Sequence, residues 1–184
     1  MRIAFTGAQC TGKTTLVTIL GKELLLPILT GQIRRVASSY GITSVDGVCR
    51  DVIRGREFQQ RCLLDQIWHE ENYQDGFISE RSVICNAFYW LKHHSFNAPS
   101  SDSVNYYQMV MNHLANNSYD LLIYLPPEIP LVADGFRSNN EQYRQESGIL
   151  MHTLAKAWCP PDVLYTISGT IEERMGKVMQ LIQG

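Results

Sequence analysis

Residues 7–14 read Gly7-Ala8-Gln9-Cys10-Thr11-Gly12-Lys13-Thr14, which is the complete G-x-x-x-x-G-K-[S/T] pattern of a phosphate-binding loop. In this pattern the glycines let backbone N–H groups close around the β-phosphate of a nucleotide. Lys13 is expected to reach the β- and γ-phosphate oxygens, and the hydroxyl of Thr14 to ligate Mg²⁺. The pattern predicts a nucleoside triphosphate site with ATP and Mg²⁺ as cofactors, in which residues 7–14 and Thr15 contact the nucleotide.

The sequence around the loop has the order of a strand, a loop and a helix. The apolar run Ile3-Ala4-Phe5 precedes it, and residues 14–20 have helical spacing, so the phosphates would lie at a helix N-terminus where the dipole favours an anion. Further strands are expected at 24–29, 77–79, 119–125 and 163–167, and further helices at 33–40, 58–74, 83–94, from Val104 onward, and at 171–182. This alternation predicts an α/β fold of the P-loop nucleoside triphosphate hydrolase type, with a parallel sheet of about five strands flanked by helices.

Length and composition favour one domain spanning residues 1–184. The chain has 184 residues, 45% of them hydrophobic, and no apolar run approaches the roughly 20 residues of a membrane span. The five cysteines form no C-x-x-C pair, which argues against a disulfide framework and a structural zinc site. We expect a protein with reduced thiols and no membrane contact, in the cytoplasm, or in the host cytoplasm if a phage encodes it; the sequence leaves the oligomeric state open.

The net charge of −2 excludes a globally basic nucleic-acid binder, but the arginines are unevenly distributed. Six of the eleven lie between residues 34 and 61, namely Arg34, Arg35, Arg50, Arg54, Arg56 and Arg61. Two interpretations are open: contacts to a phosphorylated or polymeric acceptor, through Arg34 and Arg35 first, or an ordinary solvated helix face.

Glu80-Arg81-Ser82 directly follows the expected strand 77–79, and the carboxyl ends of parallel strands meet at one edge of a sheet. Glu80 could hold Mg²⁺ through water or accept the proton of the acceptor hydroxyl, while Arg81 could stabilise charge on the transferring group and contact the substrate. The alternative is a surface ion pair. Of the aromatic residues that follow, Tyr89 could stack on an acceptor base, although core packing is the default for such residues.

Residues 134–148 have the composition of a lid. Asp134, Arg137 and Arg144 lie in this polar stretch after the strand at 119–125, and two arginines closing over the phosphates could neutralise transition-state charge and exclude water. The alternative is an exposed junction between a loop and a helix. Gly169, after the last strand, is placed where adenine often meets backbone, and His93, His94 and His113 are expected on the surface or in the core because none has a carboxylate at metal-ligand spacing.

Taken in order, the phosphate loop, Phe58-Gln59, Glu80-Arg81-Ser82, Tyr119-Asp120-Leu121 through Pro126-Pro127 and Asp134-Gly135-Phe136-Arg137 resemble one family. It comprises the P-loop nucleotide kinase-like ATPases related to the ribosylnicotinamide kinase domain of bacterial nicotinamide-nucleotide regulators. Glu80-Arg81-Ser82 also resembles the Glu-Arg-Ser motif of deoxynucleoside kinases. The resemblance implies ATP-dependent phosphorylation of a hydroxyl on a nucleoside- or nucleotide-like acceptor, with Gln59 and Gln32 on the acceptor side.

The chain departs from the family pattern at two positions. These kinases often carry an acidic residue after the second strand, where this chain has Thr30-Gly31-Gln32, and an Asp where Cys85 stands. Because Gln32 cannot deprotonate a hydroxyl, Glu80, Asp46 or Asp134 would have to help, or positioning alone must suffice. Phosphoryl transfer tolerates the second case, since its loose transition state depends more on alignment and charge neutralisation than on a strong base.

Three hypotheses follow. The first is a kinase for a small nucleoside or nucleotide, and a close variant phosphorylates a hydroxymethylated base within DNA, as in phage base-modification systems. The third, of another class, is a regulatory P-loop ATPase or switch without a phosphorylated acceptor. The arginine-rich stretch favours the DNA variant and the net charge of −2 opposes it.

Overall fold

The computed structural model describes residues 1–44, 51–132, 135–136 and 138–183, and the expected Asp46, Arg50, Asp134 and Arg137 lie outside the described residues. In the described chain, five strands form one parallel sheet in the order β2-β3-β1-β4-β5. Their bounds are β1 Arg2–Thr6, β2 Ile28–Leu29, β3 Phe77–Ser79, β4 Leu121–Tyr124 and β5 Leu164–Thr166. The predicted α/β fold with a five-stranded parallel sheet is therefore confirmed.

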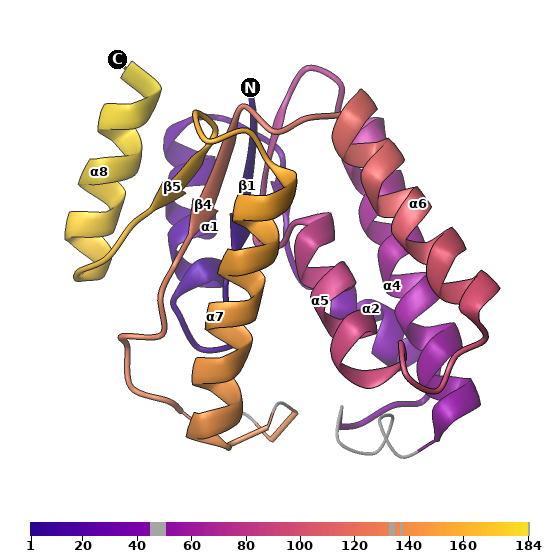
Figure 1. Ribbon diagram of the computed structural model, residues 1–184. Helices are drawn as coiled ribbons and strands as arrows, with labels where there is room; N and C mark the ends of the chain where they lie inside the picture. Colours follow the sequence, from indigo (N-terminus) through magenta and orange to yellow (C-terminus); the bar gives the residue numbers. More distant parts are fainter. Residues whose placement is uncertain (45–50, 133–134, 137, 184) are drawn as a thin grey trace.

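Helices cover both faces of the sheet (Figure 1). Their bounds are α1 Lys13–Glu23, α2 Gln32–Ser39, α4 Val52–Asn72, α5 Val83–His93, α6 Ser100–Asn116, α7 Glu141–Trp158 and α8 Ile171–Gln183. Helices α1 and α8 pack on one face, and α5 and α7 on the other, while α4 and α6 pack against α5. Parallel strands covered in this way are buried on both sides, which accounts for the continuous apolar run of β4.

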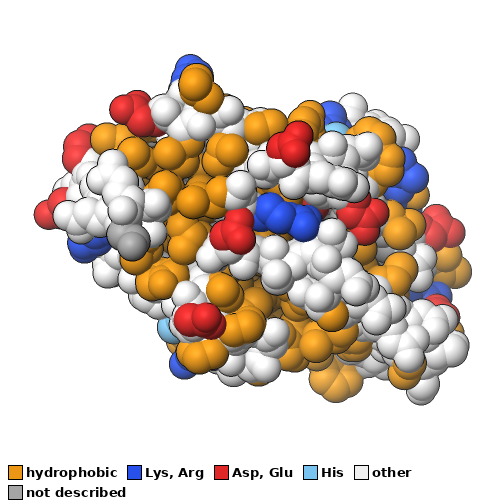
Figure 2. Space-filling model, turned by 90° about the horizontal axis from the view of Figure 1, so that it is seen from above, with side chains coloured by type: hydrophobic (Ala, Val, Ile, Leu, Met, Phe, Trp, Pro, Cys, Tyr) orange, Lys and Arg blue, Asp and Glu red, His pale blue; other side chains and the backbone are white. Residues whose placement is uncertain are grey.

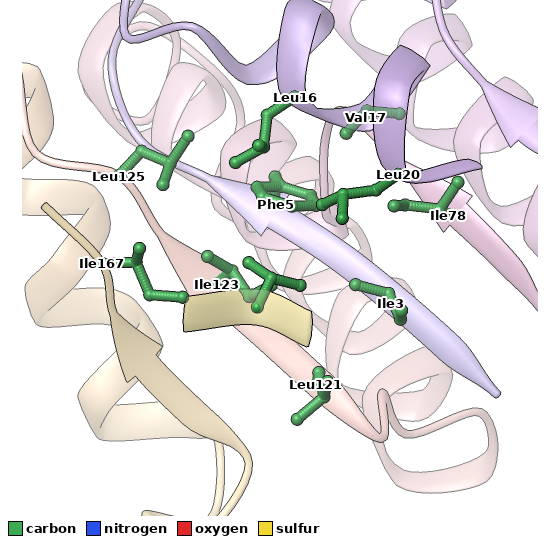
Figure 3. Packing of buried hydrophobic residues seen from close by; sticks show 11 residues of the cluster. Ile3, Phe5, Leu16, Val17, Leu20, Ile78, Leu121, Ile123, Leu125 and Ile167 are labelled. Atoms are coloured by element: carbon green, nitrogen blue, oxygen red, sulfur yellow. The ribbon is translucent and has the colours of Figure 1, made fainter. Parts of the chain in front are cut away.

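The largest hydrophobic cluster lies between the sheet and α1. Phe5 of β1 and Ile123 of β4 point toward Leu16 and Leu20 of α1, and all four are fully buried (Figure 3). Because β1 is the central strand and α1 follows it directly, this packing fixes the loop that joins them.

The starts of strand β2 and helix α4 differ from those predicted from the sequence. Residues 24–29 were predicted as a strand, but α1 continues to Glu23 and the strand is only Ile28–Leu29. The reason is the turn between them, where Leu25 has a φ of +54°. Helix α4 begins at Val52, six residues before the predicted start, because the Asp51 carboxylate caps it by accepting from the N–H of Arg54.

Helix α6 begins at Ser100 rather than near Val104, directly after Pro99. Helix α7 was not predicted, and it includes residues 141–148 of the expected lid. Its start is set by the Asn140 side chain, which accepts from the N–H of Tyr143 at 2.9 Å.

The end of the molecule where the chain begins carries hydrophobic side chains with acidic and basic groups interspersed among them (Figure 2). In the described part of the chain, no helix combines the length and the apolarity that crossing a lipid bilayer requires. Of the described cysteines, Cys10, Cys62, Cys85 and Cys159 form no disulfide, and Cys49 lies outside the described residues.

Candidate active site

The phosphate loop joins β1 to α1 and needs its glycines for conformational reasons. Gly7 has a φ of +134° and Gly12 a φ of +83°, a region that side chains disfavour. A Cβ atom on Gly7 would lie 2.5 Å from the carbonyl oxygen of Leu125, so only glycine allows β1 and the end of β4 to approach so closely. The motif therefore has the conformation that its sequence predicts.

The first turn of α1 is open toward a cavity of about 280 Å³. Gly12 is the N-cap, no side chain caps the helix, and no acidic residue lies in its first turn. Thr11, Lys13, Thr14 and Thr15 line the cavity. Uncapped N–H groups at a helix N-terminus form an anion site, so these residues fit the phosphates of a nucleotide.

Lys13 folds back over the loop. Its Nζ donates to the carbonyl oxygen of Gly7 at 2.9 Å, to that of Ala8, and to Oγ1 of Thr11 at 3.0 Å, and the side chain is 9% exposed. The ammonium group is thus held at the mouth of the cavity, where a phosphate would meet it.

Thr14 and Glu80 meet at the base of this cavity. The Thr14 hydroxyl donates to Oε2 of Glu80 at 2.6 Å, and the N–H of Gly31 donates to Oε1 at 3.0 Å. No group of three or more His, Cys, Asp or Glu side chains in the described residues could hold a metal ion. One hydroxyl and one carboxylate beside a phosphate site nevertheless fit Mg²⁺, which takes most of its ligands from substrate phosphates and water.

Arg81 lies beside Glu80 and is 9% exposed. Its guanidinium stands over the ring of Tyr89, 5.5 Å from the centroid. Burial alone lowers the pKa of Arg81, but Tyr89, Cys85 and Glu80 together raise it above its ordinary value. Cys85 is buried beneath, with Sγ 3.4 Å from Oγ1 of Thr6; burial raises the pKa of the thiol, but Arg81 and Lys13 lower it below its usual value.

A buried polar network holds the turn that carries Glu80 and Arg81. The amide of Gln66 donates to Oγ of Ser79 at 3.1 Å and to the carbonyl oxygen of Arg81 at 3.2 Å. The N–H of Val83 donates to the hydroxyl of Tyr119 at 3.1 Å. Both side chains connect to the fully buried Glu70, which also pairs with His113 at 2.6 Å. His113 is therefore a core residue, one of the two places expected from the sequence, and its Nε2 pairs with Glu70.

A second cavity of about 420 Å³ adjoins the first and shares Gln9, Thr14, Glu80 and Arg81 with it. Its other lining residues come from several elements: Thr30, Gly31, Ile33, Arg34, Phe58, Gln59, Tyr89, His93, His94, Phe136, Ser138, Asn140 and Tyr143. Most of the exposed surface in this cavity is apolar and much of it aromatic, which is the usual character of a small-molecule site.

The predicted acceptor residues divide into two groups. Arg34, Gln59 and Tyr89 line the second cavity, and the guanidinium of Arg34 lies 4.8 Å from the ring centroid of Phe136. Gln32 and Arg35 do not line it. Gln32 is 1% exposed with no hydrogen-bond partner for its amide, and Arg35 points outward to Asp65 and His69.

Sequence reasoning missed the histidines and Tyr143 as lining residues. Nε2 of His93 lies 3.0 Å from the hydroxyl of Tyr143, and the ring of His93 is nearly parallel to that of Tyr89. His94 is 3% exposed, its Nδ1 has no partner, and burial together with His93 and Arg56 lowers its pKa to about 4. The only indication in the sequence that these histidines line the cavity was that His93 and His94 are adjacent and follow Tyr89 by about one helical turn.

The lid residues are only partly placed. Asp134 and Arg137 lie outside the described residues. Arg144 does not line either cavity: it is 2% exposed, and its guanidinium donates to the carbonyl oxygens of Gln9 and Cys10 behind the phosphate loop. The expectation that it faces the phosphates is wrong in this structure, because α7 directs its side chain inward. Gly169, with a φ of +110°, lines neither cavity and donates to Oε2 of Glu128 at 3.1 Å.

The family model described as an AAA domain matches residues 2–174. No curated protein matches the chain.

Two of the similar solved structures are those of NadR and of a deoxyadenosine kinase. NadR in complex with NR superposes with a TM-score of 0.77 at 18% identity; the match covers 98% of this chain and 50% of NadR, so this chain spans half of that protein's length. Deoxyadenosine kinase from M. mycoides with bound dCTP has a TM-score of 0.72 at 16% identity, covering 100% of this chain and 99% of that one. At such identities the likeness establishes the fold. Because the family model spans nearly the whole chain, the protein belongs to the AAA domain family and has the P-loop fold of these nucleoside kinase-like structures.

Proposed function

We propose that this protein transfers the γ-phosphate of ATP to a hydroxyl of a nucleoside- or nucleotide-like acceptor, with Mg²⁺ as cofactor. The observation that carries the proposal is the pair of adjoining cavities. Glu80, Arg81 and Thr14 line both, so groups bound on the two sides would meet at these three side chains. A hydrolytic switch has no need of the second cavity.

The chemistry of the second cavity supports a ring-containing acceptor. Tyr89, Phe58 and Tyr143 offer aromatic faces, while Oε1 of Gln59 and Nδ1 of His94 are buried without a partner. Buried polar atoms without partners are costly, and a nucleobase would bring hydrogen-bonding groups and a flat face together. The similar structures are complexes of NadR with NR and of deoxyadenosine kinase with dCMP or dCTP, and these ligands are of this kind.

Each residue at the junction has a separate role in this proposal. When bound, Mg²⁺ would neutralise charge on the β- and γ-phosphates, with Thr14 as a ligand and Glu80 holding it through water. Glu80 also orients the Thr14 hydroxyl and is the nearest described carboxylate to accept the acceptor's proton. Arg81 remains charged and donates to the transferring group, and Lys13 holds the β- and γ-oxygens. For Arg137 and Asp134, which lie outside the described residues, the proposal keeps the roles expected from the sequence, charge neutralisation and help with the acceptor's proton.

The alternative acceptor, a hydroxymethylated base within DNA, is less favoured by the surface charges. Two arginines of the arginine-rich stretch pair with carboxylates: Arg35 with Asp65 at 3.7 Å and Arg56 with Asp102 at 3.8 Å. Paired guanidiniums neutralise fewer phosphates, so a polymer would gain less affinity from them.

The experiment is to incubate the protein with Mg²⁺ and γ-labelled ATP against nucleosides, nucleotides, nicotinamide riboside, and DNA with and without hydroxymethylated bases. We expect label on one small acceptor, with little dependence of its KM on salt. Label on DNA with affinity falling steeply as salt rises would support the DNA alternative. Label in free phosphate alone, unchanged by every acceptor, would contradict the kinase proposal and favour a regulatory ATPase.

A matched control separates acceptor chemistry from background hydrolysis. Tyr89 lines the second cavity, called the acceptor cavity from here on, and does not line the first, called the phosphate cavity. Tyr89→Ala removes an aromatic wall of the acceptor cavity together with the ring beneath Arg81, and Tyr89→Phe keeps that ring. Under the kinase proposal, label transfer at low acceptor concentration falls in Tyr89→Ala while hydrolysis without acceptor is unchanged.

A further inference from the structure

Arg144, on α7, binds the phosphate loop from behind. Its Nε donates to the carbonyl oxygen of Gln9 at 3.1 Å, and Nη2 donates to that of Cys10 at 3.1 Å and to that of Ile129. Nη1 pairs with Glu141, whose carboxylate is half-exposed. The guanidinium is thus buried, fully engaged and connected to a counterion that solvent reaches.

Arg174, on α8, repeats this arrangement at the next residue of the loop. Its Nη1 donates to the carbonyl oxygen of Thr11 at 2.7 Å, and Nη2 pairs with Glu128 at 3.0 Å. Arg174 is fully buried, and Glu128 is half-exposed. Two arginines from different helices therefore bind three successive carbonyl groups of one loop.

The position of these carbonyls matters because a trans peptide directs its C=O and its N–H to opposite sides. The carbonyls of Gln9, Cys10 and Thr11 share their peptide planes with the N–H groups of Cys10, Thr11 and Gly12. In the described structure no oxygen accepts from these three N–H groups. A guanidinium behind each carbonyl holds the N–H toward the opposite, phosphate side.

The remaining carbonyls of the loop are bound by a third cation. Lys13 donates to those of Gly7 and Ala8, so all five carbonyl groups of residues 7–11 accept hydrogen bonds from cationic side chains. Charge-assisted hydrogen bonds are stronger than neutral ones, and a peptide polarised at its oxygen becomes a better donor at its N–H.

We propose that Arg144 and Arg174 are positioning residues that act on the nucleotide through the backbone, by fixing the peptides of residues 9–12 with their N–H groups toward the phosphates. The inference deepens the proposed function and rests on it only for the identity of the nucleotide. It assigns Arg144 a role in phosphate binding without direct contact, in place of a lid contact to the transferring group.

The test uses Arg144→Lys and Arg174→Lys, with Arg2→Lys as the matched control. Arg2 is a partly buried arginine at the opposite end of β1, where it donates to Asn117 at 3.2 Å. Calorimetry with ADP, without acceptor, should give affinities about tenfold weaker in both loop variants, the size expected for a lost charge-assisted hydrogen bond. The control should bind ADP as the unmodified protein does.

A second measurement reports on the loop itself. The ¹⁵N order parameters of Cys10, Thr11 and Gly12 in the free protein should fall from about 0.85 toward 0.6 in the loop variants, while those of β1 stay unchanged. A loss of packing alone would lower the order parameters of β1 as well. If a lysine variant loses its native circular dichroism, Arg144→Gln or Arg174→Gln, which keep a donor, replaces it.

Unchanged ADP affinity and unchanged order parameters in the folded variants would overturn the proposal. A fall in kcat with unchanged ADP affinity would overturn it too, because it would place the arginine at the transferring group. Since neither ADP binding nor loop order depends on an acceptor, failure of the kinase proposal leaves this test intact.

Discussion

The phosphate cavity and the acceptor cavity lie side by side but are built in different ways. The first is formed largely by consecutive residues of one loop and the first turn of α1, a helix N-terminus that no side chain caps. The second takes side chains from α2, α4, α5, α7 and the segment before α7. A backbone site needs a fixed conformation, whereas a side-chain site needs several elements placed correctly.

If the two cavities bind phosphates and acceptor as proposed, this difference predicts that the first accepts any nucleoside triphosphate and that the second discriminates between acceptors. Backbone N–H groups recognise phosphate whatever is attached to it. Tyr89, Gln59 and His94 offer a particular shape and set of hydrogen-bonding atoms. Substitutions in the two cavities should therefore affect different kinetic constants.

The largest effect is expected for Lys13→Ala. Removing the ammonium group leaves the γ-phosphate charge unneutralised and frees the carbonyls of Gly7 and Ala8, so kcat should fall by a factor of about 10³. The acceptor cavity does not contain Lys13, so acceptor affinity measured by calorimetry should be preserved. Retained turnover would refute every catalytic reading of the site.

A smaller loss is expected for Glu80→Gln, at the junction of the two cavities. The amide keeps an acceptor for the N–H of Gly31 or the hydroxyl of Thr14 but loses the charge, and kcat should fall by about 10². In the proposal the Glu80 charge acts on Mg²⁺. The variant should therefore bind ADP more weakly than the unmodified protein when Mg²⁺ is present, and equally well when Mg²⁺ is chelated. If the variant and the unmodified protein had the same ADP affinity in both conditions, Glu80 would be excluded from the metal site.

The fold and the phosphate cavity could be predicted because their determinants are local. Gly7, Gly12 and Lys13 lie within eight residues, and the apolar strands around them read directly from the sequence. Helix α7 was missed because its sequence begins with the polar stretch Asn139-Asn140-Glu141-Gln142, in which the Asn140 cap was not distinguished from loop. The short β2 was overestimated because the turn is formed by Leu25, whose φ of +54° is uncommon for a leucine and is not indicated by its residue type.

The acceptor cavity could be predicted only in part because its residues converge through tertiary packing. Arg34, Gln59 and Tyr89 were identified, but Tyr143 meets His93 fifty positions away in the chain, a contact that no spacing rule indicates. Arg144 illustrates the same limit: its residue type suggested a phosphate contact, whereas the orientation of α7 directs it to the carbonyl of Gln9. Charge predicts the chemistry of a side chain, and packing decides which partner it meets.

An effect of about tenfold is expected for Tyr89→Ala, and on the acceptor alone. The ring of Tyr89 lines the acceptor cavity and carries the guanidinium of Arg81, so its loss should raise the acceptor KM by about tenfold through lost stacking. The KM for ATP should stay unchanged, and Tyr89→Phe should restore most of the acceptor affinity. A rise in the KM for ATP would show that the two cavities are not independent.

The smallest effect on activity is expected for His94 of the acceptor cavity, whose charge state affects stability instead. Burial, His93 and Arg56 lower the pKa of His94 from its ordinary 6.5 to about 4, so between these values the unfolded chain binds a proton that the folded chain does not. The free energy of unfolding should therefore fall as the pH decreases from 6.5 to 4, by at most about 3 kcal/mol for this group, since one pKa unit corresponds to about 1.4 kcal/mol. In His94→Gln that part of the fall disappears, and urea unfolding at pH 7 and pH 4.5 measures the difference between the two proteins. An identical pH dependence would mean that His94 is solvated. A reduced pH dependence in the variant would support a buried, neutral imidazole that can form a hydrogen bond with an uncharged ring of the acceptor.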